Sequence, residues 1–137
     1  MDSINQSKGS SLAIILFAHG SAVEEANEGV RELARRIQVQ GAYRYVRASF
    51  LGPGQPELGP AIAEAVGEGF DRIIVAPYFL TLGTHLRRDL PRLVMAEKEK
   101  YPNIDIQVGW SLEGHPAMAS LVLSRIREVT EGVRVSR

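Results

Sequence analysis

The stretch LAIILFAHGS, residues 12–21, decides the fold of this 137-residue chain. Its first seven residues are continuously apolar, which is typical of a strand buried on both faces of a parallel sheet. Ser21, with Glu24 three positions later, has the spacing of a capping box, and apolar residues then recur at helical intervals over residues 23–37. The stretch therefore predicts a buried strand that leads directly into a helix.

The same alternation of strand and helix continues along the chain. Further strands are expected at residues 43–50, 73–76 and 104–108, and further helices at residues 56–66, 86–94 and 116–129. This order predicts an α/β fold with a four-stranded parallel sheet and helices on both faces. The first and third strands are uninterruptedly apolar and therefore central, whereas polar residues interrupt the other two. Right-handed crossovers then give the strand order 2-1-3-4.

The last two helices carry more specific expectations. Pro91 lacks a backbone N–H, so we expect it to be tolerated only in the first turns of the helix at 86–94. His115 precedes Pro116 where the final helix should begin, and we favour a capping role for it over a contact with substrate. The buried stripe of that helix is expected to consist of Met118, Val122, Ile126 and Val129.

Composition limits the domains and partners of the chain. A single domain over residues 11–132 is expected, between a disordered tail at 1–10 and a C-terminal tail at 133–137. The 16 basic and 16 acidic side chains balance, which gives no support for nucleic-acid or membrane partners. The absence of cysteine excludes disulfides and thiolate metal sites, and it fits a cytoplasmic protein.

Two histidines fall at the same predicted edge of the sheet. His19 directly follows the first strand, and His85 lies in the loop after the third, 66 positions later. The carboxyl ends of these central strands flank the crevice in which α/β sheets bind ligands. Neutral imidazole is a good ligand for Co(II), Ni(II) and Fe(II). Two such ligands leave coordination positions open, which suits a protein that hands its metal on.

The neighbouring residues predict an anionic, partly apolar ligand. Gly20 allows close approach of a ligand, and Ser21 leads into a helix N-terminus. An apolar loop beside His85 is more useful as a ligand wall than as exposed surface. A basic pair at a helix start is best explained by an anion such as a carboxylated macrocycle. The substrate-binding residues we predict are Gly20, Ser21, Leu82, Gly83, Arg87 and Arg88.

The segments FAHGS (17–21) and PYFLTLGTHLRRDLP (77–91) resemble the class II chelatases, above all the small, single-domain CbiX-type sirohydrochlorin cobaltochelatases related to SirB. The resemblance implies a flavodoxin-like half-domain that forms a homodimer. It implies a lyase that inserts Co(II) into sirohydrochlorin during cobalamin biosynthesis, with His19 and His85 as metal-binding and catalytic residues. The chain departs from the family at Gly52, where relatives commonly have an acidic residue.

Other interpretations of the same residues remain open. The metal could be Ni(II) or Fe(II), on sirohydrochlorin or a related ring, because imidazole accepts all of these ions. A non-catalytic carrier of metal or tetrapyrrole is favoured by the missing acid at Gly52. A phosphate-binding domain that uses Gly20 and Ser21 ranks last, since no glycine-rich fingerprint is present. The divalent metal is expected as a substrate, without an organic cofactor.

Overall fold

Strand β1 (Leu12–Ala18) forms the centre of a four-stranded, all-parallel sheet in a computed structural model that describes residues 11–132. The order β2-β1-β3-β4 confirms the predicted 2-1-3-4 arrangement, with β2 and β4 as edges. The other strands are β2 (Val46–Phe50), β3 (Arg72–Tyr78) and β4 (Asp105–Val108). The tails predicted at 1–10 and 133–137 lie outside the described residues.

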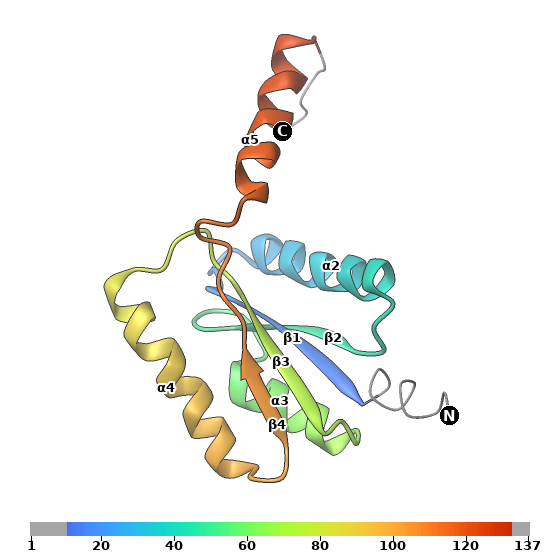
Figure 1. The fold of residues 1–137 in the computed structure, drawn as a ribbon, viewed down its shortest axis with the longest axis vertical. Coiled ribbons are helices and arrows are strands. Elements are labelled where there is room, and N and C mark those ends of the chain that lie inside the picture. Colours follow the sequence, from blue (N-terminus) through green and yellow to red (C-terminus); the bar gives the residue numbers. More distant parts are fainter. Residues whose placement is uncertain (1–10, 133–137) are drawn as a thin grey trace.

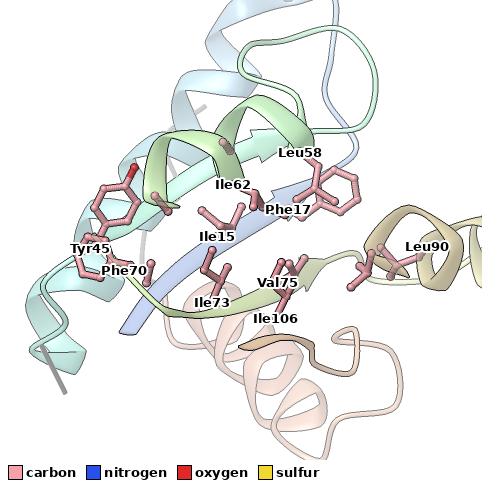
Figure 2. Close-up of a cluster of buried hydrophobic side chains, with 14 of the residues drawn as sticks. Ile15, Phe17, Tyr45, Leu58, Ile62, Phe70, Ile73, Val75, Leu90 and Ile106 are labelled. Carbon is pink, nitrogen blue, oxygen red and sulfur yellow. The ribbon is translucent and has the colours of Figure 1, made fainter. Parts of the chain in front are cut away.

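Helices cover both faces of the sheet, as predicted (Figure 1). On one face, α2 packs against β1 and β2 through Ala34 and its apolar neighbours. On the other face, α3 and α4 enclose the larger core cluster, in which Ile15 and Val75 meet Ile62 and Leu90 (Figure 2). The helices are α2 (Glu24–Gly41), α3 (Leu58–Gly67), α4 (Thr84–Lys100) and α5 (Ala117–Thr130).

Strand β1 is buried on both faces, as its apolar run predicts. The other strands differ from expectation in extent, β4 only in that it begins one residue later. Strand β2 is shorter than 43–50 and largely buried, because α2 and α3 cover its two faces. Strand β3 continues through Pro77 to Tyr78. Because β4 pairs only with the first part of β3, up to Val75, the missing N–H of Pro77 interrupts no ladder on that side.

The starts of two helices correct the sequence interpretation. The N-cap of α2 is Val23, and no side chain caps the helix, so the predicted capping box is wrong. The hydroxyl of Ser21 instead accepts the N–H of Val23, within the loop that precedes α2. Helix α4 begins at Thr84, which makes Pro91 its eighth residue and places it inside the helix. The expected restriction of Pro91 to the first turns is therefore also wrong.

Helix α5 is the largest departure from the predicted fold. None of its residues, 117–130, is buried, although a buried apolar stripe was expected. The helix projects from the end of the sheet instead of lying along it (Figure 1), so its stripe packs against no other part of residues 11–132. Of the helices in residues 11–132, not one combines the length and the apolarity needed to cross a lipid bilayer.

Candidate functional site

The loop after β1 holds His19 in a fixed main-chain position. The N–H groups of Leu51 and Gly52 donate to the carbonyls of Ala18 and His19, each over 2.9 Å, and so continue the β1–β2 ladder beyond both strands. At Gly20 the backbone has φ of +91°, and a Cβ would lie 2.2 Å from the Pro53 carbonyl oxygen. Only glycine fits there, which lets the chain turn immediately after His19.

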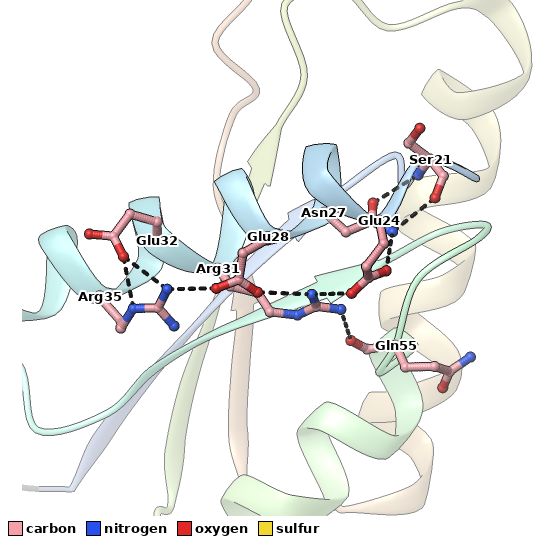
Figure 3. Close-up of polar contacts among 8 residues, drawn as sticks. All are labelled: Ser21, Glu24, Asn27, Glu28, Arg31, Glu32, Arg35 and Gln55. Atoms are coloured by element: carbon pink, nitrogen blue, oxygen red, sulfur yellow. Dashed lines mark hydrogen bonds and ion pairs between the residues drawn. The ribbon is translucent and has the colours of Figure 1, made fainter.

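A buried asparagine clasps the same loop to helix α2 (Figure 3). The side-chain oxygen of Asn27 accepts the Ser21 N–H over 2.9 Å, and its amide donates to the Ser21 carbonyl over 2.8 Å. Glu24 accepts a further bond from this amide and pairs with Arg31 at 2.6 Å. Arg31 also donates to the carbonyl of Gln55 over 2.9 Å, which joins the loops after β1 and β2.

We call these contacts of Asn27, together with the ion pairs of Glu24 and Glu28 with Arg31 and Arg35, the clasp. The opposite charges in the clasp stabilise each other. The hydrogen bond from Arg31 lowers the pKa of the Glu24 carboxyl, and the bond from Arg35 lowers the pKa of Glu28. The clasp therefore works best with its carboxyls ionised. The sequence did not single out Asn27, because its helical position resembles that of any surface residue.

His85 lies in the first turn of α4, and its ring is already engaged. The guanidinium of Arg88 lies 2.9 Å from Nδ1 of His85. A guanidinium can only donate, so Nδ1 accepts and the imidazole proton lies on Nε2. A metal ion needs a free lone pair on one ring nitrogen. Arg88 must therefore release His85 before this imidazole can bind a metal.

The structure brings the two histidines to one cleft at the carboxyl ends of β1 and β3. The cleft has a volume of about 420 Å³. His19 approaches it beside Phe79, whose ring centroid lies 6.2 Å from that of the imidazole. The residues that line the cleft are His19, Leu51, Thr81, Gly83, Thr84, His85, Leu86 and Asp89. Across residues 11–132, no group of three or more histidine, aspartate or glutamate side chains is placed to hold a metal ion.

A second cleft adjoins the histidine cleft and shares Leu86 with it; we call it the apolar cleft because most of its lining residues are apolar. Its volume is about 530 Å³, and it extends along α4 to the loop after β4. Trp110, the one tryptophan of the chain, lines it and is 97% exposed. The remaining lining residues are Leu82, Arg87, Leu90, Pro91, Val108, Gly109, Ser111 and Glu113. The sequence interpretation missed Trp110, although its position after β4 places it at the same end of the sheet as the histidines.

Of the six predicted substrate-binding residues, three line one of the two clefts and three line neither. Gly83 lines the histidine cleft, whereas Leu82 and Arg87 line the second cleft. Arg87 is paired with Glu113 through two contacts of 3.0 and 3.1 Å, so its charge is already balanced. Three others line neither cleft: Gly20 and Ser21 form the loop behind His19, and Arg88 contacts His85.

The structure also shows where the third histidine, His115, and Gly52 lie relative to the clefts. Nδ1 of His115 accepts the N–H of Ala117, the first residue of α5, over 2.9 Å. The N-cap of α5 is Pro116 and no side chain caps the helix, so the predicted capping role of His115 is wrong, and His115 lines neither cleft. A Cβ at Gly52 would meet only the His19 carbonyl oxygen, at 3.5 Å. Position 52 therefore has room for a side chain beside His19. Glu57, the nearest acid in sequence, is the N-cap residue of α3 and lines a different cavity with Glu97.

Comparisons with known proteins point to one family. The sequence model of the CbiX family matches residues 13–129. A sirohydrochlorin cobaltochelatase from Methanopyrus kandleri is 26% identical over an alignment of 137 residues, which covers 85% of this chain and 96% of that protein.

Solved structures share the fold. A CbiX protein of cobalamin (vitamin B12) biosynthesis from Marinobacter aquaeolei VT8 has a TM-score of 0.77 at 25% identity, over 88% of this chain and 98% of that chain. The sirohydrochlorin chelatase SirB from Bacillus subtilis subspecies spizizenii, solved in complex with cobalt, has a TM-score of 0.78 at 23% identity. That likeness covers 86% of this chain and 50% of SirB, so this chain spans about half of SirB.

Proposed function

Because the chain belongs to the CbiX family, we propose that it is a lyase that inserts a divalent metal, Co(II), into sirohydrochlorin in the biosynthesis of cobalamin. The observation that carries the proposal is that His19 and His85 line one cleft beside an apolar surface. An open two-imidazole site suits transient binding of a metal that is then passed to a ligand with more donor atoms.

The two clefts suggest how the substrates meet. The macrocycle lies against the apolar cleft, where Leu82 and Trp110 form a wall, and its edge reaches the histidines past Leu86. A carboxylate of the ring attracts Arg88 and draws it away from His85. Insertion exchanges the divalent ion for the inner N–H protons of the ring, and an imidazole accepts a proton at neutral pH. Positioning supplies most of the acceleration.

The proposal includes a homodimer in the cytoplasm. A tetrapyrrole is large relative to clefts of about 420 and 530 Å³ that are open on one side, and a second copy would enclose it. A chain without cysteine suits a reducing compartment.

The direct test removes each histidine in turn. His19→Ala and His85→Ala should each reduce Co(II) insertion, followed by the absorbance of sirohydrochlorin, by about a hundredfold or more. His115→Asn is the matched control, because it removes the third imidazole but keeps a side-chain acceptor for the Ala117 N–H. Near-normal rates in both alanine variants would contradict the two-histidine mechanism.

A carrier is the second candidate, and Gly52 is the observation that favours it. A carrier would bind metal or ring without turnover. Assays with sirohydrochlorin and Co(II), Ni(II) or Fe(II), each with binding measured in parallel, separate the carrier from the enzyme and identify the metal. We expect turnover, fastest with Co(II).

A further inference from the structure

A cavity lined by residues of α3 and α4 is separate from the two clefts described above. Its volume is about 290 Å³, and it shares Leu51 with the histidine cleft. Its apolar walls include Phe17 and Leu58, which lie beside each other at the carboxyl end of β1 (Figure 2), and Leu93 of α4. We call it the α3–α4 cavity. Neither His19 nor His85 lines it, so it is not part of the proposed metal site.

Glu97 brings a buried carboxylate to the α3–α4 cavity. The residue is only 8% exposed. Its Oε2 accepts a hydrogen bond from Nζ of Lys100 over 3.1 Å. Its Oε1 is buried and meets no hydrogen-bond partner within residues 11–132. Because a desolvated carboxylate oxygen is costly unless a donor meets it, Oε1 points to a donor that comes from outside these residues.

Gly59, the second residue of α3, keeps space for this carboxylate. A Cβ at position 59 would lie 3.2 Å from Oε2 of Glu97 and 3.9 Å from Oε1. Alanine is the stronger helix former, so the helix alone gives no reason for a glycine here. The missing side chain therefore leaves the carboxylate of Glu97 open toward the cavity.

The charges around the α3–α4 cavity define the kind of ligand. Glu57 and Glu97 bring two negative charges, and Lys100 balances one of them. A divalent metal ion would exceed the remaining charge and would lie close to the Lys100 ammonium. It would also lack ligands, because within residues 11–132 no three acidic or histidine side chains are placed to hold a metal. A single ammonium group matches both the charge and the free acceptor.

We propose that the α3–α4 cavity binds a small primary amine with an apolar body. The ammonium donates to Oε1 of Glu97, the exposed Glu57 adds attraction at the rim, and the hydrocarbon part lies against Phe17 and Leu93. A volume of about 290 Å³ is at the lower end for ligand pockets, which start at roughly 300 Å³, so the amine is small. This inference does not rest on the chelatase proposal.

An NMR titration with benzylamine tests the site, with benzyl alcohol as an uncharged probe of similar shape. Benzylamine should shift the backbone amide signals of Gly59 and Leu93 until they saturate, whereas Gly83, which lines the histidine cleft, should not respond. Benzyl alcohol should bind at least about tenfold more weakly, because it lacks the charged donor. Unmoved signals at Gly59 and Leu93, or equal affinity for the two probes, would overturn the proposal.

Variants locate the charge that holds the amine. Glu97→Gln keeps the shape of the side chain and removes its charge, so the affinity for benzylamine should fall about tenfold or more. Glu99→Gln removes the same charge from an exposed position on α4 and should leave the affinity unchanged. Gly59→Ala places a methyl group against the carboxylate and should also weaken binding. Equal affinities in Glu97→Gln and Glu99→Gln would refute the assignment to Glu97.

Manganese distinguishes an amine site from a metal site. Mn(II) favours carboxylate oxygens, and it broadens the NMR signals of nearby residues through its unpaired electrons. We expect the Gly59 signal to stay sharp when Mn(II) is added. Broadening at Gly59 that disappears in Glu97→Gln would assign the cavity to a metal ion and would overturn the amine proposal.

Discussion

The guanidinium of Arg88 donates a hydrogen bond to Nδ1 of His85 over 2.9 Å, one turn apart on α4. This bond uses the only lone pair of a neutral imidazole. In the free protein Arg88 and an incoming metal therefore compete for His85. An anionic ring that attracts Arg88 would remove the competitor, so ring binding and metal binding should support each other.

Removal of Arg88 should separate these two effects. Arg88→Ala frees the His85 lone pair, so Co(II) without ring should bind about tenfold more tightly, since a hydrogen bond to a charged group contributes about 1.5 kcal/mol or more. The same variant should bind the ring more weakly. Calorimetric titration with Co(II) measures the first effect, with Arg92→Ala, an exposed arginine further along α4, as control. Unchanged Co(II) affinity would show that Arg88 does not block His85.

An acid at position 52 should improve the site. The backbone there leaves room for a side chain beside His19, so Gly52→Glu supplies a carboxylate that can accept protons from the ring or assist metal delivery. We expect Co(II) insertion to accelerate about a hundredfold, at the lower end of what a positioned acid or base contributes. Gly67→Glu adds the same side chain to α3, where a Cβ meets nothing within 4 Å. Equal rates in the two variants would rule out a role for position 52.

The buried asparagine should contribute measurably to stability. Asn27→Ala leaves the N–H and carbonyl of Ser21 without their partners, and we expect the free energy of unfolding to fall by about 1–3 kcal/mol. Urea denaturation measures this change. Asn103→Ala, at an exposed position, should change the same quantity by less than about 0.5 kcal/mol. A small effect at Asn27 would mean that water replaces its bonds.

Acid should loosen the same clasp. Hydrogen bonds from Arg31 and Arg35 lower the folded-state pKa of Glu24 and Glu28, respectively, below the ordinary value of 4.5. Their stabilising contribution is therefore present above about pH 4.5 and is lost as the pH falls through the lower, folded-state values. Denaturation curves from pH 7 downward should show this decline, and it should be shallower in Arg31→Gln. High salt should also flatten it, because both carboxyls are exposed.

Trp110 should report on ring binding. It lines the apolar cleft and is the one tryptophan of the chain, so metal-free sirohydrochlorin should quench its fluorescence at a fixed protein concentration. Trp110→Ala should raise the KM for the ring about two- to tenfold, the range expected for an aromatic contact. Val39→Ala, on an exposed side of α2, should leave KM unchanged. Fluorescence that does not respond to the ring would place the ring elsewhere.

The sheet and the pair of histidines could be predicted because both depend on local patterns. Continuous apolar runs identified β1 and β3 as central, and the strand order placed His19 and His85 at one edge. The partners of the charged residues could not be predicted, because Glu113 meets Arg87 from 26 positions away. The sequence also showed which side of α5 is apolar, but periodicity cannot say which surface, or which chain, covers it.

The extension of the β1–β2 ladder to His19 and Gly52 makes the two proposed metal ligands unequal. His19 is anchored through its main chain to the centre of the sheet, whereas His85 stands on the first turn of a helix and can swing as Arg88 approaches or withdraws. A metal held by both would detach from His85 first and remain tethered at His19 while ring nitrogens take the vacated position. In the proposed mechanism the transfer would proceed one bond at a time, so that the ring would capture the ion before the protein releases it.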